Sequence, residues 1–192
     1  MKAKDVAIYI IKTFQEAGDT LTNLKLQKLL YYVQGWHLGL YEEPLFEDDI
    51  EAWKYGPVVP EVYNWFKEYG NSPVSITDKN VDSWNIDVSA RDHVDEVLRI
   101  YAPESAWTLS EITHNEQPWL NSIKEKLNII PIASIKEHFK ELAEKDVSSF
   151  HYLKNKPFEH HQYDSDSPWE HDLNSFSNVK TDYNEIKKIM GW

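Results

Sequence analysis

The sequence contains no cysteine, which excludes disulfide bonds, thiol catalysis and thiolate metal sites. It has only six glycines, and neither a phosphate-binding loop nor a dinucleotide-binding fingerprint can be assembled from them. No Gly-x-Ser-x-Gly elbow and no His-Glu-x-x-His motif occurs. The longest apolar run, residues 6–11, is far shorter than the ~20 residues that a membrane helix needs. The first residues lack the apolar core and cleavage site of a signal peptide, so we expect a cytoplasmic protein that does not bind membranes.

The charge balance is acidic. Twenty Lys and Arg residues stand against 32 Asp and Glu residues, which gives a net charge of −12. Such a surface repels phosphate, so we expect no nucleic-acid partner and favour a basic protein partner instead. Aromatic residues make up 14% of the chain, including eight tryptophans and eleven tyrosines. Aromatic side chains fill cores and also dominate protein interfaces, so this content is consistent with a protein-binding role.

The clearest element is a helix over about residues 23–39. Thr22 is a suitable N-cap, and Leu21 and Leu26 have the spacing of a hydrophobic staple. One face carries an apolar stripe, and the opposite face carries Gly35 and Gly39, which weaken a helix unless another segment packs closely against them. A helix contacted on two sides is central, so we predict that this one lies buried in the middle of the fold.

The rest of the chain predicts a mainly α domain with a minor, short antiparallel β element. We expect helices over 3–17, 60–69, about 89–101, 105–113 and 118–126, and one beginning at Ser134; Ser89 and Ser134 start capping-box patterns. Short strands are expected at 50–53, 74–77 and 84–88, with a turn at 56–60. We predict a compact domain over residues 1–148 and an irregular C-terminal extension over 149–192, with a short terminal helix over 181–190.

Several histidines and carboxylates are candidates for catalysis or metal binding. His114 and Glu116 have the spacing of a base and its orienting group, but capping of helix ends is the favoured interpretation. His37 lies in the apolar stripe and is expected to be a core residue. The histidines of the extension lack the spacing of a helical metal site. These histidines are His151, His160, His161 and His171. We therefore predict no catalytic residue, no cofactor and no metal site.

An acidic segment over residues 42–51 has two interpretations that the sequence leaves open. Its carboxylates form either a solvated loop or, with the interleaved Pro44, Leu45, Phe46 and Ile50, a surface that docks a protein.

Several blocks together resemble the Panacea domain of the SocA-type antitoxins, a phage-associated family. They are LKLQKLLYY at 24–32, PLF at 44–46, IEAW at 50–53, YGPV at 55–58 and VY at 62–63, followed by Leu109, THNE at 113–116 and PW at 118–119. The order and spacing of the LQKLLYY and GPV blocks are specific, and the resemblance spans roughly residues 3–145.

The resemblance implies a non-enzymatic antitoxin that neutralises a cognate protein toxin by direct binding. One branch of the family is similar to adaptors that deliver the bound toxin to a host protease, which would be a second partner. Two alternatives remain: a phage or mobile-element regulator that binds a host protein, and a hydrolase-like enzyme that uses His114 and Glu116. The identity of the toxin and the oligomeric state do not follow from the sequence.

Candidate partner-binding residues come from the motifs and the acidic segment. Gln27, Lys28, Tyr31 and Tyr32 do not all fit the apolar stripe of their helix, so we expect them at an interface. The remaining candidates are Glu47, Asp48, Asp49, Trp53, Tyr55, His114, Glu116 and Trp169.

Overall fold

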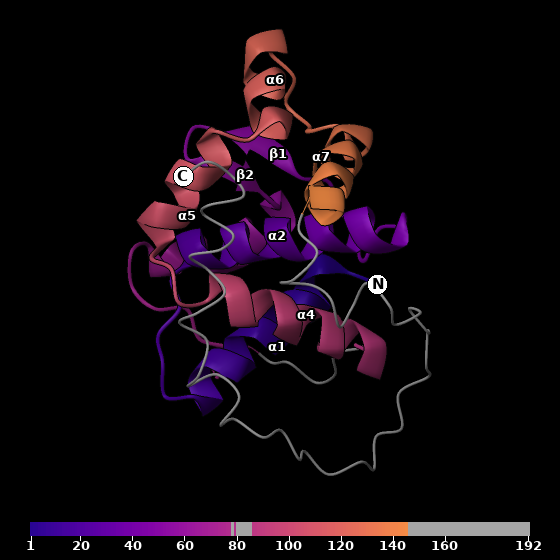
Figure 1. The fold of residues 1–192 in the computed structure, drawn as a ribbon. Coiled ribbons are helices and arrows are strands. Elements are labelled where there is room, and N and C mark those ends of the chain that lie inside the picture. Colours follow the sequence, from indigo (N-terminus) through magenta and orange to yellow (C-terminus); the bar gives the residue numbers. More distant parts are fainter. Residues whose placement is uncertain (78, 80–85, 146–192) are drawn as a thin grey trace.

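The computed structural model describes residues 1–77, 79 and 86–145. The extension over 149–192, with its expected terminal helix, histidines and Trp169, lies outside these residues. Of the expected strand at 84–88, residues 84 and 85 also lie outside them; the expectation is wrong for the other three, because Asp87 caps a helix that begins at Val88. The described chain is mainly α, as predicted (Figure 1). Its elements are α1 (Ala3–Glu16), α2 (Asn23–Tyr41), β1 (Glu51–Trp53), β2 (Gly56–Val58), α3 (Pro60–Phe66), the 3-10 helix η1 (Lys67–Tyr69), α4 (Val88–Tyr101), α5 (Ala106–His114), α6 (Gln117–Glu125) and α7 (Ile132–Lys145).

Helix α2 crosses the middle of the molecule, with α1 and α4 on one side and the β-hairpin, α5 and α7 on the other (Figure 1). Its glycines lie against α7, because a Cβ built on Gly35 would be 2.2 Å from the Phe139 ring and one built on Gly39 would be 2.6 Å from the Phe139 carbonyl carbon. His37 is buried, as predicted. The prediction of a central helix with a second, closely packed face is confirmed.

The ends of the helices depend on local hydrogen bonds. Thr22 caps α2 as predicted, its side chain accepting from the Lys25 N–H. Two predicted caps are wrong. Asp87, not Ser89, caps α4 and accepts the Ala90 N–H at 2.8 Å. Helix α7 begins before Ser134, because the carbonyl of Pro131 already accepts the N–H groups of Ser134 and Ile135.

The β element is an antiparallel hairpin in which Glu51, Ala52 and Trp53 pair with Val58, Pro57 and Gly56. The outer edge of β1 is covered by residues 128–130, through hydrogen bonds from the Ala52 N–H to the Asn128 carbonyl and from the Ile130 N–H to the Ile50 carbonyl, both 2.8 Å. The expected turn at 56–60 is therefore strand as far as Val58. Residues 74–77 form no strand; only an isolated bridge joins Thr22 to Pro73.

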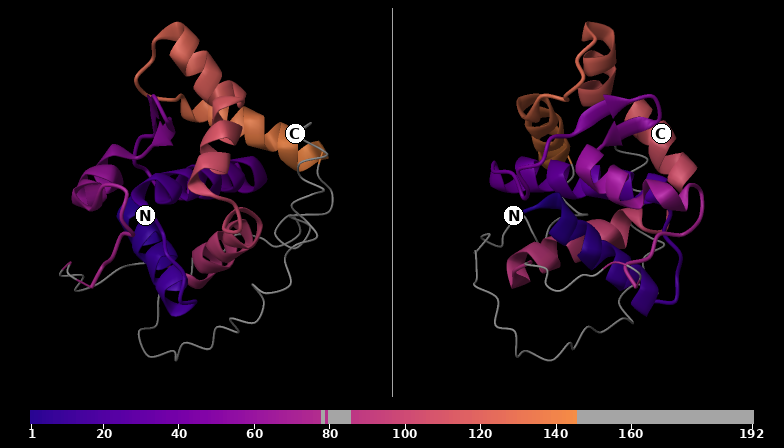
Figure 2. Two further views of the ribbon diagram at one scale, coloured as in Figure 1. Left: turned by 90° about the vertical axis from the view of Figure 1, so that its left-hand side faces the viewer. Right: turned by 180° about the vertical axis from the view of Figure 1, so that it is seen from behind.

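Helix α6 projects from the body of the molecule in both views of Figure 2. In the part of the chain that the structure describes, no helix is long and apolar enough to cross a membrane.

Candidate partner-binding site

The polar motif residues of α2 meet the free edge of β2. The Lys28 Nζ donates to the Pro57 carbonyl at 3.0 Å, and the Gln27 Oε1 accepts the Val59 N–H at 2.9 Å. Gly56 has a φ of 98°, and a Cβ there would lie 2.6 Å from the Lys28 Nζ and 2.7 Å from the Thr113 Oγ1. The blocks at 24–32, 55–58 and 113–116 therefore come together in one buried joint, which holds the hairpin against α2.

Glu116 brings a carboxylate into this joint from the turn between α5 and α6. Its side chain is 2% exposed, and the Tyr32 hydroxyl donates to its Oε1 at 3.2 Å. Burial raises the pKa of Glu116, partly opposed by Tyr31, Tyr32 and Lys28. Burial also lowers the pKa of Lys28, against the attraction of Glu116. The His138 Nε2 lies 3.9 Å from the other Glu116 oxygen, and burial lowers its pKa to about 4, so this ring is neutral at pH 7.

Five predicted contact residues lie in the interior. Gln27, Lys28, Tyr31, Tyr32 and Glu116 are each no more than 2% exposed. The expectation that the α2 residues outside the apolar stripe lie at an exposed interface is wrong, because residues 26–39 are buried. Gln27, Lys28 and Tyr32 form internal hydrogen bonds. Of the five, only Gln27 also lines the surface described next; the others lie beneath it.

That surface is a groove of about 710 Å³ between the hairpin, α3 with η1, and the start of α5. Tyr55 and Trp107 stand at its rim, 53% and 62% exposed. Gln27, Trp53 and Tyr55, all predicted from the sequence, are brought together here. The lining residues are Asn23, Leu24, Gln27, Trp53, Lys54, Tyr55, Val58, Tyr63, Lys67, Gly70, Asn71 and Trp107.

The aromatic walls of the groove are held by hydrogen bonds to carboxylates behind them. The Trp53 indole N–H donates to Glu51 at 2.7 Å, and that of Trp107 donates to Glu111 at 3.2 Å. The Trp53 ring packs edge-to-face on Tyr63, with centroids 4.8 Å apart. Because the rings are oriented before a partner arrives, binding loses less side-chain entropy at these positions.

His114 supports the hairpin from beneath. Its Nε2 donates to the Lys54 carbonyl at 3.1 Å, and its ring lies 4.3 Å from that of Trp119, whose indole N–H donates to the Trp53 carbonyl. Glu116 instead faces Tyr32. No hydrogen bond joins His114 to Glu116 among the described residues, so the base-and-orienter geometry of the enzyme alternative is not formed here. The described part of the chain also holds no group of three or more His, Asp or Glu residues that could bind a metal ion.

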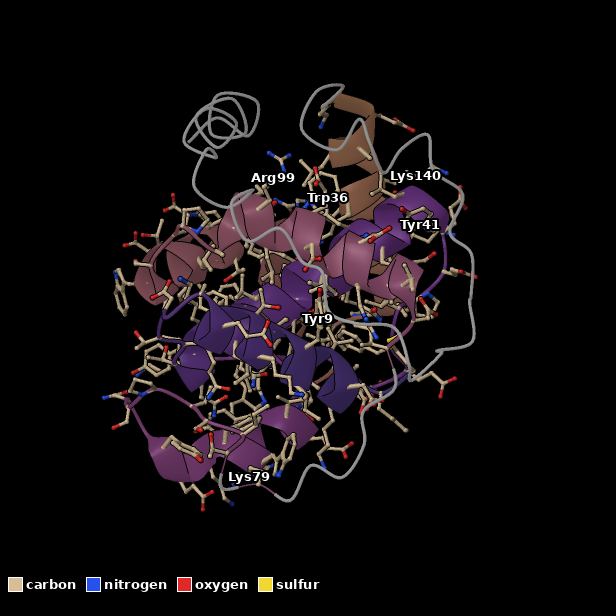
Figure 3. All side chains as sticks on the ribbon, turned by 90° about the horizontal axis from the view of Figure 1, so that it is seen from below. Tyr9, Trp36, Tyr41, Lys79, Arg99 and Lys140 are labelled. Carbon is tan, nitrogen blue, oxygen red and sulfur yellow. The ribbon has the colours of Figure 1, made fainter. Side chains whose placement is uncertain are left out.

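No residue of the acidic segment lines the groove, although Glu51 at its end bonds Trp53. The Asp48 carboxylate accepts the Ala3 N–H at 2.8 Å and thus caps α1, whereas Glu47 and Asp49 are exposed. Glu42 pairs with Lys140 on α7, which Figure 3 shows beside the end of α2.

Three of the four apolar residues of the same segment are core residues, so the docking interpretation is wrong for them, whereas Pro44 is exposed. Leu45, Phe46 and Ile50 are at most 4% exposed. The Gln34 side chain accepts the N–H groups of Leu45 and Phe46 and donates to the Phe46 carbonyl, which fixes the segment to α2.

Sequence reasoning missed Trp107, Lys54, Lys67 and Tyr63. A signal existed for Trp107, because it does not share the apolar stripe of Leu109 and Ile112 on its helix. Trp169 lies outside the described residues and stays a prediction.

A second exposed apolar surface, here called the α6 ridge, consists of Leu120, Ile123, Leu127, Ile129 and Ile132, which are 38–50% exposed. It lies outside the groove.

Comparison with known proteins identifies the motif-bearing part of the chain. The family model described as "Antitoxin SocA-like, Panacea domain" matches residues 26–120. A protein named "Antitoxin SocA", from Caulobacter vibrioides (strain NA1000 / CB15N), is 48% identical over 68 residues, which are 35% of this chain and 36% of that relative. No solved structure matches. The matched span contains the whole buried joint and most of the groove. Residues 26–120, just under half of the chain, thus match the SocA-like Panacea antitoxin family.

Proposed function

We propose that this protein is an antitoxin that neutralises a cognate toxin in the cytoplasm by direct binding, and that the aromatic groove contacts the toxin. The observation that carries the proposal is the family match over residues 26–120. Because the alignment covers only about a third of the SocA relative, the identity of the toxin is not transferred. Delivery of the bound toxin to a protease is a further proposal that rests on the family resemblance alone.

The groove supports this assignment energetically. Binding energy at protein interfaces is concentrated in a few Trp, Tyr and Arg side chains that fill well-packed sites. Tyr55 and Trp107 are large, exposed and attached to rigid elements: the Tyr55 carbonyl accepts the Ser110 hydroxyl at 2.9 Å, and the Trp107 indole is bonded to Glu111. The buried joint beneath them fixes their spacing.

The test is growth rescue on co-expression with the product of the adjacent reading frame, combined with co-purification. We expect the wild type to rescue, and Tyr55→Ala with Trp107→Ala to weaken binding about 30-fold and abolish rescue. Val88→Ala, at an equally exposed position on α4, is the matched control. Circular dichroism establishes that each variant is folded.

Other outcomes contradict parts of the proposal. If Ile123→Ala with Leu127→Ala abolishes rescue and the groove variant does not, the toxin binds the α6 ridge and the contact surface is wrong. If no adjacent gene is toxic, or the wild type does not rescue, the antitoxin function itself is wrong, and a regulator of a host protein replaces it.

A further inference from the structure

The charge of the groove is opposite to that of the chain. The protein carries a net charge of −12, yet among the residues that the structure describes the only charged side chains that line the groove are Lys54 and Lys67. The nearby carboxylates of Glu51 and Glu111 are not part of the lining and accept the indole N–H groups of Trp53 and Trp107. The described lining itself therefore carries two positive charges and no negative one.

Both lysines are available to a ligand. Across residues 1–77, 79 and 86–145, neither forms an ion pair. The Lys54 Nζ lies over the Tyr55 ring, 5.3 Å from its centroid, which directs it along the aromatic rim. A carboxylate placed between these two cations gains charge-assisted hydrogen bonds without displacing an internal partner.

The remaining lining sets the size and character of the ligand. Four aromatic rings form the walls, and Leu24 and Val58 add apolar surface. Cavities of about 300–1,000 Å³ enclose a drug-sized ligand. A groove of about 710 Å³ therefore encloses a short peptide stretch and not the face of a whole domain.

The geometry points to recognition of an extended acidic segment of the partner protein, with a large apolar side chain between the aromatic walls and flanking carboxylates at Lys54 and Lys67. That the partner is a toxin rests on the proposed function. Whether the groove binds an acidic segment can be tested independently. This acidic ligand differs from the basic partner surface expected from the net charge of the chain. A basic surface would instead suit the exposed Glu47 and Asp49, which do not line the groove.

Single-stranded nucleic acid is the competing occupant, because stacked aromatics with lysines also bind bases and phosphates. Nucleic-acid binding depends on cations that neutralise successive phosphates. Two lysines in a chain of net charge −12 do not supply such a run, whereas they match a peptide with two carboxylates.

The probe is a short fluorescein-labelled peptide with a central Phe flanked by Asp and Glu, and the assay is fluorescence anisotropy on the full-length chain. We expect the peptide to bind, the affinity to fall as salt is raised, and a version with Lys in place of the acids not to bind. Lys54→Glu with Lys67→Glu should reduce affinity at least about tenfold. Lys124→Glu with Lys126→Glu makes the same change of net charge on exposed residues at the C-terminal end of α6 and should have no effect.

The inference is wrong if the acidic peptide does not bind, or if both lysine double variants lose the same affinity for it. It is also wrong if an oligo-dT or oligo-U probe binds more tightly than the peptide. A fourth contrary result is tighter peptide binding after Asp164→Asn with Asp166→Asn. The last would mean that the chain's own acidic stretch, not a partner, is the occupant. The two proposals fail separately. If the Tyr55 and Trp107 variant loses rescue while the Lys54 and Lys67 reversal retains it, the antitoxin surface stands and the acidic ligand is wrong.

Discussion

Replacing Gly35 by Ala tests the close approach of α7 to α2. An exposed Gly→Ala change inside a helix stabilises by about 1 kcal/mol. At Gly35 the new methyl carbon would lie 2.2, 2.4 and 2.5 Å from three atoms of the Phe139 ring. That ring is buried and packs edge-to-face on Trp36 and Tyr31, with centroids 5.4 and 5.6 Å away, so it has no room to rotate. Overpacking costs about 1–3 kcal/mol, and the fixed ring places this site near the upper value, for a net loss of about 2 kcal/mol.

Gly39→Ala provides the comparison, because its Cβ would meet the Phe139 backbone, 2.6 Å from the carbonyl carbon and 2.7 Å from the oxygen. Shortening the ring by Phe139→Leu should therefore relieve Gly35→Ala but not Gly39→Ala. We expect a favourable coupling of at least about 1 kcal/mol for the first pair and close to zero for the second. Urea unfolding followed by circular dichroism gives each free energy. If Gly35→Ala raises stability, or is additive with Phe139→Leu, the close-packing explanation is wrong.

Three further predictions concern caps and buried charge. Asp87→Ala should lower the free energy of unfolding by about 1 kcal/mol, and Ser89→Ala by much less, because only Asp87 caps α4; urea unfolding of both measures this. Burial lowers the pKa of His93 to about 3, from about 6.5 in the unfolded state. Between these pH values the unfolded state binds more protons than the folded state. The free energy of unfolding should therefore fall as the pH drops from 6.5 to 3, by up to about 1.4 kcal/mol per pH unit. A smaller slope is expected in His93→Gln, and equal slopes would contradict the assignment. Lys28→Met should lower the free energy of unfolding by about 1–3 kcal/mol because it leaves the Pro57 carbonyl without its buried donor and removes a positive charge near Glu116, and the added change Glu116→Gln should recover part of that loss in urea unfolding.

Much of the fold could be predicted because its signals are local. The cap at Thr22, the apolar period of α2 and the glycines on its other face lie within one short stretch of sequence. Strand β2 could not be predicted in the same way. Gly56 and Pro57 are typical turn residues, and they form a strand here because β1 pairs with them on one edge while Lys28 and Gln27 bond the other.

The candidate site was harder to predict, since burial of a polar side chain depends on distant partners. Lys28 and Tyr32 lie outside the apolar stripe of α2, which usually indicates exposure. Their partners come from Pro57 and Glu116, which are far away in the sequence. The aromatic content indicated an interface, but only the fold shows that Trp53, Tyr55 and Trp107 line the same groove.

The buried joint and the exposed groove differ in how freely their residues can be substituted, and this limits what can be inferred from the family match. Gln27 and Lys28 bond the backbone of Val59 and Pro57, and Glu116 accepts from Tyr32, so changing any of these three side chains leaves a buried polar group without its partner, at a cost of about 1–3 kcal/mol or more. Trp107 has no such constraint, because its exposed ring bonds only a carboxylate on its own helix. The motifs that define the family therefore specify how the hairpin is held. In the proposed function, the choice of partner rests on rim residues that can change without unfolding the domain.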